Sequence, residues 1–176
     1  MSPHVSSATK MKDRIQIRLY REDDAASVGR LIARTYRAYN LSEADPEEQE
    51  RLLGPFRFAE SDSPHQQRAN QDVLHSPMLY VAEVDEQICG VLRGRANVLA
   101  SLFVDGRMHR QGIGRSLVER FEKDSRNVGV QWVRVASTLF AVPFYLALGY
   151  KRTTGVRRLH SFGGSSLFYQ PMKKQL

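Results

Sequence analysis

The N-terminal part of the chain shows two patterns of apolar and polar residues. Residues 15–19 alternate apolar and polar, which predicts a half-buried β-strand. Over 28–39 the apolar residues recur three or four positions apart, which predicts a helix with one apolar face. Asp23 or Asp24 can cap the start of that helix, because a carboxylate accepts from its unpaired N–H groups. A strand followed by an amphipathic helix is therefore expected at the start of the fold.

The rest of the chain repeats these patterns. The predicted elements are a helix from Asp45-Pro46 to Gly54-Pro55, a short helix over 66–75, a hairpin of strands 78–84 and 87–93, a strand over 97–104, a helix over 113–123 that ends by Gly129, a strand over 130–137, a helix from Pro143 to Gly149, and two strands around Gly163-Gly164. This order predicts an α/β fold on a mixed sheet. We expect one domain over 14–176 and a flexible tail over 1–13.

A basic loop with two glycines joins the apolar run 98–104 to the helix that begins near Ile113. The free N–H groups and the dipole at a helix start favour anions. Gly112 and Gly114 let the backbone approach an anion closely, because no Cβ stands in the way. Arg107, Arg110 and Arg115 add positive charge around the loop. The loop therefore predicts a phosphate-binding site, or else a plain glycine turn at a helix start.

Two other phosphate-binding loops fit this segment less well. A dinucleotide-binding turn has a third glycine, which residues 116–118 do not supply. A P-loop has Gly-Lys-Ser/Thr, which is also missing here. The segment from His109 to Gly114 instead resembles motif A of the GNAT superfamily of N-acetyltransferases, Gln/Arg-x-x-Gly-x-Gly/Ala. Residues 141–150 resemble the motif B helix of the same family, and the whole resemblance spans residues 14–174.

The resemblance implies a GNAT fold, in which helices flank a mixed central sheet and two splayed central strands hold acetyl-CoA. Here those strands would end at Val104 and Ser137. The pantetheine arm would pair with the main chain of Leu102, Phe103 and Val104, as an added strand would. The implied pyrophosphate-binding residues are His109, Arg110, Gln111, Gly112, Ile113, Gly114 and Arg115.

The resemblance also implies direct attack by a primary amine, of a small molecule or a peptide, on the thioester. Tyr145 resembles the tyrosine that often acts as the general acid of the family, although a helix aromatic at this position can also pack in a core. Three positions depart from the pattern. His109 replaces Gln or Arg, Asn97 falls where some members carry a glutamate base, and Ala136 replaces an asparagine. A CoA-binding or CoA-sensing module without turnover is therefore the alternative function.

The acceptor is harder to predict. Five acidic residues, Glu43, Asp45, Glu47, Glu48 and Glu50, could attract a cationic amine or form a solvated helix face. Six aromatic residues could line a pocket or fill the core, namely Tyr36, Tyr39, Phe56, Phe58, Phe168 and Tyr169. The histidines have no spacing typical of a metal site, so no metal is expected.

The composition of the chain limits which partners and which cellular setting are expected. The net charge is +7, but the basic residues are spread along the chain without a Lys/Arg block, so nucleic-acid binding is not expected as the main role. The single cysteine, Cys89, is predicted to be a small buried side chain. A chain with one cysteine cannot form an internal disulfide, which indicates a reducing, cytoplasmic setting. No run of 18 apolar residues occurs, so no membrane span is expected. The family resemblance implies a possible homodimer through the final strands.

Overall fold

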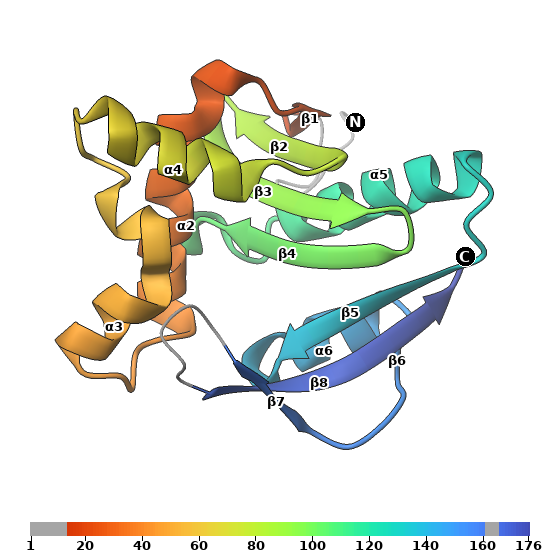
Figure 1. Ribbon diagram of the computed structural model, residues 1–176. Helices are drawn as coiled ribbons and strands as arrows, with labels where there is room; N and C mark the ends of the chain where they lie inside the picture. The colour runs from red at the N-terminus through yellow and green to blue at the C-terminus, as the bar shows by residue number, and fades with distance from the viewer. Residues whose placement is uncertain (1–13, 161–165) are drawn as a thin grey trace, which may run out of the picture.

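The computed structural model describes residues 14–160 and 166–176 of the chain. Figure 1 shows the elements in space. In chain order they are β1 (Gln16–Leu19), η1 (Glu22–Asp24), α2 (Ala25–Tyr39), α3 (Pro46–Leu53), η2 (Gly54–Phe58), α4 (Pro64–Leu74), β2 (Met78–Val84), β3 (Gln87–Arg95), β4 (Val98–Val104), η3 (Gly106–Met108), α5 (Ile113–Asn127), β5 (Trp132–Thr138), η4 (Leu139–Ala141), α6 (Val142–Ala147), β6 (Lys151–Arg152), β7 (Arg157–His160) and β8 (Ser166–Gln175).

The strands form one eight-stranded sheet in the order β1-β2-β3-β4-β5-β8-β6, with β7 also paired to β8. Every pairing is antiparallel except that of β4 with β5. In Figure 1, α2, α3 and α4 lie on one side of strands β1–β4 and α5 lies on the other, while α6 lies behind β5 and β8. The predicted mixed α/β fold is confirmed.

Two apolar cores lie on the two faces of the sheet. On the α5 face, Leu117 and Phe121 are fully buried against strand residues such as Leu92. On the α2 face, Val28 and Leu53 are equally buried. Burying one such side chain contributes about 1.5–3 kcal/mol. The two cores hold both helical layers against β1–β4 and so fix the position of β4.

Left-handed backbone positions end several elements. Asp85 and Glu86, with φ of 51° and 63°, form the two-residue turn between β2 and β3. Both central residues of a tight hairpin turn of this kind need positive φ. Gly129 and Gly149, with φ of 82° and 88°, follow α5 and α6 at the predicted positions.

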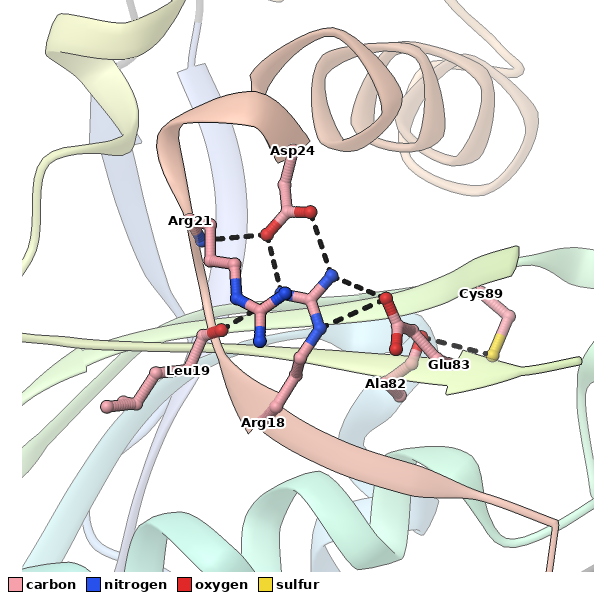
Figure 2. Close-up of polar contacts among 7 residues, drawn as sticks. All are labelled: Arg18, Leu19, Arg21, Asp24, Ala82, Glu83 and Cys89. Atoms are coloured by element: carbon pink, nitrogen blue, oxygen red, sulfur yellow. Dashed lines mark hydrogen bonds and ion pairs between the residues drawn. The ribbon is translucent and has the colours of Figure 1, made fainter. Parts of the chain in front are cut away.

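A partly buried ionic network ties β1 to β2 and to the start of α2 (Figure 2). Arg18 binds both carboxylate oxygens of Asp24, at 2.7 and 2.8 Å, and also pairs with Glu83. Asp24 accepts a further bond of 2.7 Å from the backbone N–H of Arg21. The prediction that Asp24 caps the following helix is therefore wrong in its detail. Asp24 stands at the cap position, but its carboxylate is already used by Arg18 and Arg21.

Two other expectations are changed or confirmed by the structure. A third strand, β6, joins the two predicted at the C-terminal end. Its two residues, Lys151 and Arg152, are both exposed, so they leave no alternating signal. Cys89 is buried as expected, and its thiol lies 3.4 Å from the carbonyl oxygen of Ala82. The predicted tail over 1–13 and the predicted turn at Gly163-Gly164 fall outside the described residues.

Candidate active site

The first two residues of β4 pair with the middle of β5, and the remaining described residues of β4 do not pair with it. The register joins Val98 to Arg134 and Leu99 to Val135, and among the described residues it goes no further. Between β3 and β4 the register shifts at this point, because Gly94 faces Leu99 whereas Arg93 faces Ser101. Ala100 is therefore an extra residue, a β-bulge. A bulge bends its strand, which accounts for the divergence of β4 from β5.

The divergence leaves one edge of β4 open where the resemblance places acetyl-CoA. Leu102, Phe103 and Val104 pair with β3 through their other edge. Their side chains are half-buried, with Phe103 against the α2-side core and its two neighbours against the α5-side core. Side chains can thus pack on both faces of the sheet while the outer backbone edge stays open for an extended ligand.

The loop after β4 presents its backbone to the same opening. Arg110 has φ of 64° and Gly112 has φ of 91°. Left-handed residues next to right-handed ones turn successive N–H groups toward one point, which is how backbone anion sites form. Gly112 is the N-cap of α5, and a Cβ at this position would meet nothing within 4 Å. There is therefore open space beside Gly112, at the helix start where the N–H groups of Ile113 to Arg115 have no partner within the helix.

Gly114 serves a different purpose in the same loop. A Cβ on this residue would lie 3.2 Å from the ring of Phe144 and 3.6 Å from a methyl group of Val104. Its missing side chain lets α5, α6 and the end of β4 come together. The N-terminus of α5 is thereby held at the end of the diverging strands.

A buried carboxylate anchors the loop. Asp105 accepts bonds from the backbone N–H of Arg107 at 3.0 Å, from the guanidinium of Arg107 at 2.8 Å and from Arg34 of α2 at 2.6 Å. These contacts, chiefly the hydrogen bond from the Arg107 side chain, lower the pKa of Asp105 to about 2 even though burial alone would raise it. Asp105 therefore stays charged and fixes the direction in which the chain leaves β4.

His109 turns away from the helix start. Its Nε2 lies 3.0 Å from the carbonyl oxygen of Val104. A carbonyl only accepts, so Nε2 carries the proton. The ring also packs on Tyr39, with 4.9 Å between centroids. The imidazole is thus held by β4 and α2, and the backbone N–H of His109 is donated to the carbonyl oxygen of Gly106 at 3.3 Å. The position therefore fixes the start of the loop, and the N–H groups that follow it are the ones that can face an anion.

Two tyrosines of α2 lie over the ends of the diverging strands. Tyr36 contacts the edge of Phe103, with ring centroids 5.9 Å apart. Tyr39 packs on His109, which follows β4, and stacks at 5.5 Å on Phe140, which follows β5. Tyr39 therefore contacts the chain on both sides of the divergence. Among the aromatic residues considered from the sequence, these two are the ones brought to this place.

The remaining aromatic residues are divided between core and surface. Phe56 is buried in the α2-side core, whereas Phe168 is 51% exposed. Phe58 carries the guanidinium of Arg57 on its ring. They do not join the two tyrosines in a common pocket lining that the structure describes.

Tyr145 is the fourth of the six residues of α6. Its side chain is 4% exposed, and its ring packs on Phe144 and Tyr150 with centroids 5.0 and 5.4 Å away. Burial raises the pKa of Tyr145 well above its usual value. The phenol therefore holds its proton at neutral pH, which is the state that a general acid needs.

Two of the positions that depart from the family pattern, Asn97 and Ala136, have structural roles or exposed places in the sheet. Asn97 lies in the turn between β3 and β4, where its carbonyl accepts from the N–H of Arg134 at 2.9 Å. Ala136 is exposed and faces Pro171 across β8. The acidic residues near α3 have local partners, since Asp45 caps the helix at 2.9 Å from the N–H of Glu48 and Glu50 pairs with Arg37 at 2.7 Å.

A hollow of about 720 Å³ lies on the other side of the Asp105 anchor. Arg30, Arg34 and Arg107 line it together with the turn between β2 and β3. Residues 109–115 do not line it, so it is separate from the glycine loop. Across residues 14–160 and 166–176 no group of three or more His, Cys, Asp or Glu could hold a metal ion. In the same part of the chain, no helix has the length and apolar character needed to cross a membrane.

The fold and the loop together define a class of protein. An α/β sheet with a bulged, diverging central strand leads into a glycine loop at a helix start. Such an arrangement suits a ligand with an extended arm and a phosphate group. The sequence matches the model of the acetyltransferase (GNAT) domain family over residues 44–176. The chain therefore belongs to the GNAT family, and it is an acyltransferase that uses acetyl-CoA.

Solved structures support the same fold. A GCN5-related N-acetyltransferase from Rhodopseudomonas palustris superposes with a TM-score of 0.76 at 18% identity, covering 92% of this chain and 95% of that one. The PaiA N-acetyltransferase from Thermoplasma acidophilum, solved with coenzyme A, gives 0.63 at 17% identity, covering 92% and 99%. A ribosomal-protein-alanine N-acetyltransferase from Brucella melitensis gives 0.59 at 18% identity over the same shares.

Proposed function

We propose that the protein transfers the acetyl group of acetyl-CoA to a primary amine of a small molecule or a peptide by direct attack. The observation that carries this proposal is the end of β4–β5 pairing at Leu99 and Val135. The open edge of β4 runs from this point directly into the glycine loop. An extended pantetheine arm and a pyrophosphate need these two features in this order.

In this proposal the backbone of Leu102, Phe103 and Val104 pairs with the pantetheine arm. The pyrophosphate takes the N–H groups of Arg110, Gln111, Gly112, Ile113, Gly114 and Arg115, whereas His109, whose N–H is bonded to Gly106, holds the start of the loop. The two left-handed residues and the empty space beside Gly112 support this assignment. Positive charge at the helix start and the arginine side chains balance the phosphate charge.

Acetyl-CoA supplies an activated thioester, and the enzyme supplies position and one proton. By holding the amine beside the thioester, the enzyme makes a bimolecular reaction effectively unimolecular. This lowering of the activation barrier is the main contribution of the site to the rate. Tyr145 donates its phenolic proton to the departing sulfur and recovers a proton from solvent. The amine loses its own proton to water, because Asn97, at the position of the family base, is an amide and lies in a turn.

The acceptor amine enters beside Tyr36 and Tyr39 in this proposal. These side chains lie over the divergence from the α2 side. The acidic residues of α3 are engaged in capping and ion pairing, so they give no specific support to a cationic acceptor. The two tyrosines fit an acceptor with apolar or aromatic character near its amine.

The experiment that tests this function measures release of free CoA thiol with a panel of small amines and peptides. We expect steady thiol release that depends on an amine. The Tyr36→Ala variant should raise the KM for the amine more than it weakens acetyl-CoA binding, because Tyr36 contacts the side chain of Phe103 and not the glycine loop. Binding of acetyl-CoA without amine-dependent release across the panel would instead favour the CoA-sensing alternative.

A further inference from the structure

The net positive charge of the chain comes from its C-terminal part, where acidic residues are missing. The chain has 26 Lys and Arg and 19 Asp and Glu. Residues 125–176 contain eight of the basic residues and none of the acidic ones, so the rest of the chain is close to neutral. Apart from Arg126 of α5, the basic residues of this segment lie in the strands β5–β8. The basic excess looks diffuse along the sequence, but it is confined to one part of the fold.

One face of this half-sheet is open to solvent. On the other face Val133, Val135 and Met172 are buried, and Figure 1 shows α6 behind β5 and β8. On the open face Arg134 and Lys173 are exposed. The alternation of buried and exposed residues along β5 and β8 shows that no described part of the chain covers this face.

The sheet register gathers basic side chains on the open face. Arg134 lies opposite Lys173, and Lys173 lies opposite Lys151 on its other side. Opposite residues of antiparallel strands project from the same face, and neighbouring strands are about 4.8 Å apart. Three cations therefore form one row across three strands, within about one Debye length of each other. Arg157 adds a fourth cation opposite Tyr169.

The row formed by Arg134, Lys173 and Lys151 lowers the stability of the folded protein. Like charges directly opposite each other destabilise a sheet by up to about 1 kcal/mol for a pair. Among the described residues, no carboxylate forms an ion pair with any of the four cations. Lys174, which points to the other face, is in contrast paired with Glu122 at 2.6 Å. The cations of the open face therefore do not stabilise the fold through ion pairs with the described residues.

Aromatic side chains lie on the same face. Trp132 and Tyr169 belong to the open face by register, and both are half-buried. The ammonium of Lys173 lies 4.2 Å from the Trp132 ring centroid. Small side chains, Ala136 and Pro171, separate the cation row from the row that contains Tyr169. Cations for a phosphate backbone and rings for bases thus lie in neighbouring rows of the same face.

From these observations we propose that the open face of β5, β8, β6 and β7 binds single-stranded nucleic acid. Unstacked bases can lie on aromatic rings while phosphates contact the cation row. A duplex keeps its bases stacked and offers nothing to Trp132. An acidic peptide would use the cations but not the rings. A second copy related by a two-fold axis would place the cation row against itself.

The test measures binding of a fluorescent single-stranded oligonucleotide as a function of salt, with CoA present to saturate the phosphate loop. Four phosphate contacts predict a slope of log affinity against log salt of about −3, at about −0.7 for each contact on a single strand. The variant Arg134→Gln/Lys151→Gln should halve this slope and weaken binding about tenfold or more at low salt. The matched control Arg95→Gln/Lys123→Gln removes two exposed cations elsewhere and should leave the slope unchanged.

The aromatic part is tested separately. Trp132→Leu should weaken oligonucleotide binding by about 5- to 100-fold without changing the salt slope. Tyr169→Leu is the second aromatic variant, in case loss of the half-buried Trp132 affects folding. Equal binding by the charge variant and its control would overturn the proposal. Competition by polyglutamate as strong as by the oligonucleotide, with no effect of either aromatic variant, would also overturn it and indicate an acidic protein partner.

Discussion

The two halves of the sheet differ in how many of their faces are covered and in whether their charged side chains are paired. Strands β1–β4 are covered on both faces, and their partly buried ions are matched, as in the Arg18–Asp24–Glu83 network (Figure 2). Strands β5–β8 are covered on one face, and the row from Arg134 to Lys151 has no acidic partner in the described residues. The first half is built for stability, whereas the second keeps an exposed, charged surface.

The proposed acetyl-CoA site lies where the two halves separate. The bulge at Ala100 ends the pairing of β4 with β5, so one half-sheet can turn away from the other. Residues of the first half, above all Asp105 and Arg34, then hold the loop that begins the site. Rigid packing on one side and a free strand edge on the other are both needed for an extended cosubstrate.

The largest effect is expected at the junction of the halves. Gly112→Glu places a carboxylate where the pyrophosphate is proposed to bind, and like charges in contact cost several kcal/mol. We expect a loss of acetyl-CoA affinity of about 10³-fold in a calorimetric titration. Gly129→Glu is the matched control, because Gly129 has a similar positive φ and open surroundings at the other end of α5. Equal loss in both variants would show strain rather than a phosphate site.

The next effect concerns the proton that Tyr145 is proposed to donate. Tyr145→Phe should lower kcat about 10²-fold, the lower end for general acid catalysis, because a thiolate leaves fairly well unaided. Acetyl-CoA affinity should stay the same. Tyr20→Phe, far from the divergence, serves as the control. Unchanged turnover with Tyr145→Phe would assign this residue to the core alone.

A third effect tests the anchor supplied by the first half. The pKa of Asp105 is lowered to about 2 in the folded protein from a usual 3.8. Its stabilisation is therefore present above pH 4 and is lost as the pH falls toward 2. Asp105→Asn should lower the free energy of unfolding at pH 7 by about 2 kcal/mol. Urea unfolding at pH 7 and near pH 2 measures the free energy of unfolding of both proteins. Between these pH values the Asp105→Asn variant should lose less of it than the parent protein does. Equal losses would contradict this role of Asp105.

The smallest effect has the opposite sign. Lys151→Gln, and still more Lys151→Glu, should raise the free energy of unfolding by about 0.2–1 kcal/mol, because each relieves repulsion from Lys173. Arg152→Glu is the control, since Arg152 lies opposite Met172 on the other face of β8. Thermal unfolding measures both. Destabilisation by Lys151→Glu would contradict the claim that the cation row costs stability.

Local sequence signals predicted much of this molecule, because they act within one element. Gly112, Gly129 and Gly149 marked turns at positions where the structure has positive φ. The order of strands and helices followed from their periodicity. The assignment of individual site residues, including Tyr145, stays a prediction.

Features that depend on pairing between distant segments could not be read in this way. The bulge at Ala100 exists only in relation to Gly94 of the neighbouring strand. The contacts of Arg34 with Asp105 and of Tyr39 with His109 join residues far apart in the chain. The same holds for the basic face, because residues spread over the sequence become neighbours only through the register of β5, β8 and β6.

The most direct test of the central claim is amide hydrogen exchange with and without acetyl-CoA. The account holds that the open edge of β4 and the glycine loop bind one ligand together. Acetyl-CoA should therefore slow exchange at residues 101–104 and 109–115, and leave exchange in β6, β7 and β8 unchanged. Protection of the loop without β4, or protection confined to another surface, would contradict the account.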